Sequence, residues 1–150
     1  VRRQCVAIGN WSSVVVSILE TDHWCMMLPE EWHAENDDDV IRIVDQDDVG
    51  EIEITTLHKQ SGRVNASDVA ALASEESPEI SEWHQARAGG FEGVTGLYRE
   101  DGASVREWYL GSESLLLYIT YVCAEEDEGL DEASVIELLG TLVVGDSQAA

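Results

Sequence analysis

The stretch DQDDVGEIE, residues 45–53, is the nearest approach in this sequence to a metal-binding motif. Its first, third and sixth residues are Asp, Asp and Gly, as in a calcium-binding EF-hand loop. The fifth is Val49 and the twelfth is Thr56, so two ligands are missing, one of them the bidentate carboxylate. The flanks VIRIV and EIEIT alternate like strands, whereas an EF-hand loop joins helices. We predict a turn between strands, with weak, non-selective cation binding left as an alternative.

Other reactive side chains do not converge on a known chemistry. His23 and Cys25 would share one face of a strand, and Cys123 could lie across from them, but a structural zinc site needs a fourth ligand. The sequence has no Walker loop, G-x-S-x-G or G-x-G-x-x-G motif. Three cysteines without CxxC spacing fit reduced thiols in a cytoplasmic protein. We therefore expect no catalytic residue, no cofactor and no metal.

The charge excludes two classes of partner. Thirty-one acidic residues face eight basic ones, giving a formal net charge of −23. Such a surface repels nucleic acid and anionic lipid, which are bound largely through Lys and Arg. No apolar run approaches the ~20 residues that cross a bilayer. The acidity indicates either adaptation to a salty environment, the simpler interpretation, or a face that binds a basic partner.

Aromatic residues supply the candidate partner surface. In the predicted strand SVREWYLG, Arg106 and Trp108 share one face and Tyr109 lies on the other. Because both faces carry a large ring, one interpretation is that one of the two rings is exposed, and Trp32 is a further candidate. Trp, Tyr and Arg dominate interface hot spots, so Trp108, Arg106, Tyr109 and Trp32 are the candidates. The alternative, which we favour, is that each ring belongs to the core.

Hydrophobic periodicity predicts a single α+β domain over residues 1–150. The fold class is an antiparallel meandering β-sheet of about six strands with two helices packed on it, in the order β-β-β-α-β-β-β-α and with an extra strand at the front left open. Residues 114–123 are apolar on both faces, so they should form a central strand. The predicted strands are 14–19, 23–28, 40–44, 50–59, 91–100, 104–111 and 114–123, and the first helix is 65–76.

Capping signals place the two helices. Asn65 is a good N-cap for the first helix and has an acidic residue three positions on. Asp131 should cap the second helix, with Leu130 and Val135 forming a hydrophobic staple across the cap. Ile136 belongs to the apolar stripe that this second helix is expected to bury.

The stretch MMLPEEWHAE, residues 26–35, carries a family resemblance through Leu28, Pro29 and Trp32. With the elements that follow, it resembles small bacterial proteins of the PsbP-like α+β fold over most of residues 24–144. The resemblance implies a non-enzymatic binding or accessory role. Some members are chaperones for secreted effector proteins, and others are assembly subunits. Residues 1–12 have no counterpart and are a candidate disordered segment.

These observations favour a highly acidic protein-interaction module, such as a chaperone or adaptor for a secreted protein, with a basic or apolar protein as its partner. Secretion chaperones are often dimers, so a homodimer is left open. One alternative is an immunity or inhibitor protein that masks a basic toxin through fast, salt-sensitive association. A carboxylate- or metal-dependent enzyme is the least favoured alternative.

Overall fold

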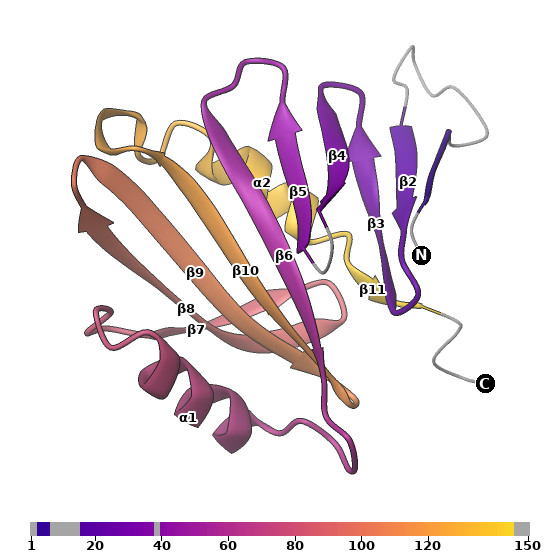
Figure 1. Ribbon diagram of the computed structural model, residues 1–150, viewed down its shortest axis with the longest axis vertical. Coiled ribbons are helices and arrows are strands. Elements are labelled where there is room, and N and C mark those ends of the chain that lie inside the picture. Colours follow the sequence, from indigo (N-terminus) through magenta and orange to yellow (C-terminus); the bar gives the residue numbers. More distant parts are fainter. Residues whose placement is uncertain (1–2, 7–15, 38–39, 146–150) are drawn as a thin grey trace.

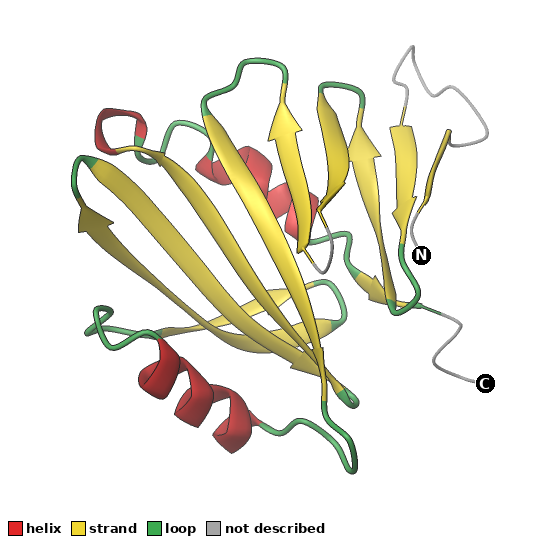
Figure 2. Cartoon of the chain, in the orientation of Figure 1, coloured by secondary structure: helices red, strands yellow, loops and turns green. Residues whose placement is uncertain are grey.

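The computed structural model describes residues 3–6, 16–37 and 40–145, which form two antiparallel sheets, two α-helices and a short 3-10 helix (Figures 1 and 2). The larger sheet has seven described strands in the order β4-β5-β6-β10-β9-β8-β7. They are β4 (Trp32–Asp37), β5 (Val40–Asp45), β6 (Gly50–His58), β10 (Leu115–Ala124), β9 (Ala103–Ser112), β8 (Phe91–Glu100) and β7 (His84–Ala88). The smaller sheet has the described order β1-β2-β3-β11, made of β1 (Arg3–Val6), β2 (Val16–Glu20), β3 (Trp24–Pro29) and β11 (Val143–Val144).

The prediction of an α+β protein with antiparallel sheet and two helices is confirmed, but that of one sheet with about six strands is wrong. The predicted order β-β-β-α-β-β-β-α is also wrong, because six described strands precede the first α-helix, four lie between the two α-helices and one follows the second. The hairpin of β2 and β3 forms a second sheet with β1 and β11. Strands β4 and β7 were missed because they are polar edge strands, WHAEND and HQARA, without an apolar alternation. Of the predicted disordered segment 1–12, Arg3–Val6 form β1, and the remainder lies outside the described residues.

The prediction of a central strand at 114–123 is confirmed by β10, which pairs with β6 on one side and β9 on the other. Successive side chains of a strand point to opposite faces of the sheet. Leu115 and Leu117 therefore enter the main core, whereas Leu116 lies in a separate cluster on the opposite face. The two sheets meet at Trp24, whose indole Nε1 donates a hydrogen bond of 2.9 Å to Thr56 Oγ1.

The two helices cover opposite faces of the larger sheet (Figure 1). Helix α1 (Ala66–Glu76) is capped as predicted, since the Asn65 side chain accepts a hydrogen bond from the Asp68 amide and the Asp68 carboxylate accepts one from the Asn65 amide. Its buried residues Val69 and Ala73 pack with Tyr109. Helix α2 (Glu132–Leu139) contributes to the main core instead, through its buried residues Val135, Leu138 and Leu139.

The start of α2 differs from the prediction in three respects. Asp131 stands at the N-cap position, but its side chain does not cap the helix and instead accepts a hydrogen bond of 3.2 Å from the Tyr121 hydroxyl. Leu130 is 66% exposed, so it forms no buried staple with Val135. Ile136 is 52% exposed because the helix packs on the sheet through Val135 and Leu138, which lie on its other side.

The acidic stretch at 45–50 connects β5 to β6, which confirms the predicted turn. The Asp45 carboxylate accepts a hydrogen bond of 3.0 Å from the Asp48 amide, and Asp48, rather than Gly50, has the positive φ of this turn, at 57°. Gly50 is required for a different reason. A Cβ there would lie 2.3 Å from the Tyr121 hydroxyl oxygen, so only glycine leaves room for that ring.

Candidate interaction surface around helix α2

The expectation that one face of β9 exposes an aromatic ring is wrong. Trp108 and Tyr109 are only 5% and 3% exposed, and Trp32 is 4% exposed. Both faces of β9 are covered: the main core, to which α2 belongs, covers Trp108, and α1 covers Tyr109. The favoured alternative, that each ring belongs to the core, is therefore the one that the structure shows.

Three of the four predicted residues nevertheless border α2. Arg106, which is half-buried, and Trp108 line a cleft on one side of the helix. Trp32 lines a groove that also involves α2 residues Ser134, Glu137 and Leu138. Tyr109 is separated from this group because it faces α1. The surface of interest is thus centred on α2, which sequence reasoning had treated only as a core element.

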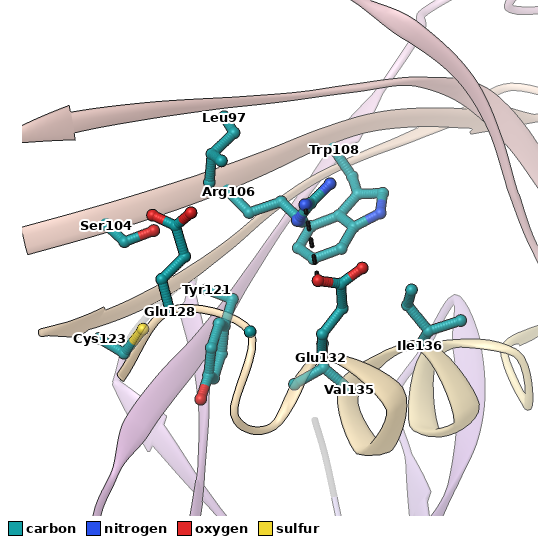
Figure 3. Close-up of a pocket in the computed structure, with 11 residues that line it drawn as sticks. Leu97, Ser104, Arg106, Trp108, Tyr121, Cys123, Glu128, Glu132, Val135 and Ile136 are labelled. Atoms are coloured by element: carbon teal, nitrogen blue, oxygen red, sulfur yellow. Dashed lines mark ion pairs between the residues drawn. The ribbon is translucent and has the colours of Figure 1, made fainter. Parts of the chain in front are cut away.

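The cleft beside α2 is small, and Figure 3 shows the side chains that line it. The guanidinium carbon of Arg106 lies 5.9 Å from the centroid of the Trp108 ring, and its Nη2 lies 4.0 Å from a carboxylate oxygen of Glu132. The cleft volume is about 30 Å³, close to the share of one water molecule in the liquid. This volume accommodates only a small part of a side chain and is far smaller than the ~300 Å³ at the lower end for small-molecule pockets. Also lining it are Leu97, Ser104, Tyr121, Cys123, Glu128, Gly129, Val135 and Ile136.

Burial and neighbouring charges shift the pKa values of three titratable groups in this cleft. Burial, followed by the neighbouring carboxylates, raises the pKa of the Cys123 thiol, so the thiol stays protonated near neutral pH. Burial and the charge of Asp131 likewise raise the pKa of the Tyr121 phenol. The Arg99 guanidinium lowers the pKa of Glu128, which it binds at 2.7 Å from Nε and 2.5 Å from Nη2. The arrangement is suited to contact and charge recognition.

The rim of the cleft is strongly acidic. Residues 125–132, here called the acidic loop, read EEDEGLDE, in which six of the eight residues are carboxylates. Leu130 within this loop and Ile136 on α2 are both largely exposed. A contiguous apolar patch rimmed by polar groups marks an interaction site, so these two exposed side chains, with carboxylates near them in the sequence, make this region a candidate for one. The sequence analysis assigned Leu130 to a hydrophobic staple and Ile136 to a buried stripe, and the signal that could have corrected the first was the density of acidic residues on either side of Leu130.

Carboxylates from the 45–50 turn approach the same end of α2. Asp45 is only 8% exposed. Burial raises the pKa of Asp45 first, and the negative charge of Asp131 raises it further, so the two carboxylates lie near enough to repel one another. Across the described residues no group of three or more His, Cys, Asp or Glu side chains is placed to hold a metal ion.

A second polar cluster lies on the opposite face of the sheet, under α1. Glu107, which is 3% exposed, accepts hydrogen bonds from the Ser77 hydroxyl at 2.5 Å and from the Tyr118 hydroxyl at 2.9 Å. The Ser77 oxygen also lies 2.7 Å from the Tyr109 hydroxyl. Ser77, Glu107 and Tyr109 are buried and Tyr118 is half-buried, and their hydrogen bonds connect the end of α1 to β9 and β10.

Comparisons with known proteins bear on the fold. The solution structure of cyanobacterial PsbP (CyanoP) from Synechocystis sp. PCC 6803 matches with a TM-score of 0.57 and 13% identity, covering 83% of this chain and 88% of that one. The chain has a PsbP-like fold. A crystal structure of a protein from Bacteroides thetaiotaomicron VPI-5482 matches this PsbP-like chain with a TM-score of 0.60 and 15% identity. That match covers 82% of this chain and only 45% of the Bacteroides protein.

Neither a family model nor a curated protein matches the PsbP-like chain. The structural matches are below 25% identity, so the predicted resemblance is confirmed for the fold, and what the chain binds stays a prediction. Within the part of the chain that is described, no helix has the length and apolar character needed to cross a bilayer.

Proposed function

We propose that this protein is a non-enzymatic interaction module that binds a basic protein through the acidic loop and the exposed side of α2. The observation that carries the proposal is the placement of Leu130 and Ile136, exposed by 66% and 52%, within a rim of carboxylates. The carboxylates supply charge selection, and the apolar side chains supply contact area that water would otherwise cover.

The electrostatics favour a basic protein over the other partner classes. With a net charge of −23, the chain attracts cations over distances comparable with the Debye length, about 8 Å at physiological salt. Association is therefore expected to be fast and to weaken as salt is added. The same field disfavours nucleic acid and anionic membrane.

Two biological roles use such a surface. In the first, which we favour, the protein is a cytoplasmic chaperone or adaptor that holds a secreted protein. In the second, it is an immunity protein whose basic partner is a toxin. Identification of the partner separates them, because a toxin loses its activity in the complex, whereas a chaperoned protein is released for export.

The proposal is tested with two variants of equal charge. Glu126→Gln with Glu132→Gln neutralises two exposed carboxylates of the acidic loop, and Glu75→Gln with Glu76→Gln neutralises two exposed carboxylates at the end of α1. Tagged wild-type and variant proteins are expressed in the cells of origin, and the proteins recovered with them at low salt are compared. We expect the partner to be retained by the α1 variant and depleted with the acidic-loop variant. Equal recovery with both variants would contradict the proposed surface.

A further inference from the structure

A groove lies between α2 and the segment that links β3 to β4. Its volume is about 180 Å³, which is room for one long side chain. Met27 and Pro29 come from β3, and Trp32 opens β4. The residues that line the groove are Met27, Pro29, Glu31, Trp32, Ser134, Glu137, Leu138 and Thr141.

The floor of this groove is apolar and firmly held. Trp32 and Leu138 are buried, whereas Met27 is 47% exposed and forms an open wall. The Thr141 hydroxyl accepts a hydrogen bond of 3.0 Å from the Met27 amide and donates one of 2.8 Å to the Leu138 carbonyl. These bonds fasten the end of α2 to β3, so the groove has a defined shape with one adaptable wall, since Met repacks easily against different partners.

Two carboxylates at the rim of the groove have no basic side chain as an ion-pair partner among the described residues. Glu31 and Glu137 are exposed, and neither forms an ion pair with any other residue in the described part of the chain. In the cleft on the other side of α2, by contrast, Glu128 is bound by Arg99. The groove therefore combines apolar walls with negative charge that nothing in the described chain compensates.

This combination matches one kind of side chain. Lysine and arginine bury an aliphatic stem along apolar surface while the charged head reaches polar groups at the edge. Resting on the proposed function, we propose that the groove receives a lysine or arginine of the partner's basic segment. The stem lies along Met27 and Pro29 over the floor formed by Trp32, and the charged head lies between the carboxylates of Glu31 and Glu137.

Methionine methyl signals test this placement directly. The chain has two methionines, Met26 at 1% exposure and Met27 at 47%, so methyl-labelled protein gives one internal control and one reporter. The probe is hexalysine with blocked ends, and a second probe replaces each lysine by 2,4-diaminobutyrate, which has the same charge and a shorter stem. We expect hexalysine to shift the Met27 signal and leave that of Met26 unchanged, and the short-stem probe to shift Met27 less.

A blocked groove provides the matched variant. Ser134→Trp places a ring in the groove, whereas Ala133→Trp places the same ring on the neighbouring exposed position of α2, which does not line it. We expect hexalysine to bind Ser134→Trp at least about fivefold more weakly than Ala133→Trp, the loss typical of one significant interface contact.

The outcomes separate the two proposals. If Met27 does not move and both tryptophan variants bind alike, while amide signals of the acidic loop still shift, the groove proposal is wrong and the proposed function stands. If hexalysine moves neither the acidic-loop signals nor Met27 at low salt, both proposals are wrong.

Discussion

The two faces of the larger sheet are stabilised by different means, although the same strands supply both. One face packs against the smaller sheet and α2 in a large apolar core that includes Trp24, Ile54, Leu117 and Leu139. The other packs against α1 in a cluster whose buried members are Val69, Ala73, Tyr109 and Leu116. On the α1 face, in the described part of the chain, Glu107 is a buried carboxylate with hydroxyl partners.

This difference shows that α1 is held by a specific hydrogen-bonded contact, whereas the core under α2 is held by buried apolar area. Burial contributes roughly 25 cal/mol for each Å² of apolar surface and does not depend on direction. A buried carboxylate depends on each of its partners, because losing one leaves a polar group without compensation. The exposed outer residues of α2 add little to this buried area, so they can form the proposed binding surface at little cost in stability.

The largest expected effect compares adjacent residues of β10. Leu117 is fully buried in the main core, and Leu116 is 6% exposed under α1. We expect Leu117→Ala to lower the free energy of unfolding by about 2–5 kcal/mol and Leu116→Ala to lower it by less, since the smaller cluster has fewer apolar neighbours to lose. Chemical denaturation measures both. A loss below about 1 kcal/mol for Leu117→Ala would contradict its place in the core.

A smaller effect is expected from Ser77→Ala, which removes a hydroxyl shared by Glu107 and Tyr109. The variant leaves one oxygen of a buried carboxylate without its donor, so unfolding should become easier by about 1–3 kcal/mol. Ser74→Ala, at an exposed position of α1, is the control. If the two variants were equally stable, α1 would be held by apolar contact alone and the contrast between the two faces would disappear.

The smallest effect concerns Asp45, close to α2. The pKa of Asp45 in the folded state is raised above the ordinary value of 3.8. In the pH range between 3.8 and the folded pKa, the folded state therefore binds more protons than the unfolded state. Stability from this group is therefore lost with rising pH. Asp45→Asn should be more stable than the wild type at neutral pH, and the gain should vanish as the pH falls toward 3.8. Thermal unfolding across pH measures it, with Asp47→Asn as the control for net charge; a gain independent of pH would exclude this cause.

Local signals in the sequence were sufficient for the elements that have strong apolar alternation or complete caps. The strand at 50–59 and the α1 cap at Asn65 were both predicted from short-range rules. The division into two sheets was not predicted, since which hairpin pairs with which is decided by distant contacts such as that between Trp24 and Thr56.

The candidate site was predicted less well because burial depends on which face of each element is covered. From the sequence alone, Trp108 and Tyr109 are equally good candidates for an exposed ring, because the elements that cover their strand are unknown. In the structure each ring is covered on the side of a different helix. Ile136 looks buried in an apolar run, and only the packing of α2 turns it outward. The sequence shows that residues 125–132 are acidic, but it does not show that apolar side chains beside them are exposed, and the proposal of a binding surface depends on that exposure.

Amide hydrogen exchange of the complex with its partner tests the central claim most directly, because it compares the two helices in one molecule. We predict slower exchange across Glu125–Asp127 and Glu132–Leu139 when the partner is bound, with exchange in Ala66–Glu76 unchanged. Protection confined to Ala66–Glu76, with none at α2, would contradict the assignment of the acidic loop and α2 as the binding surface.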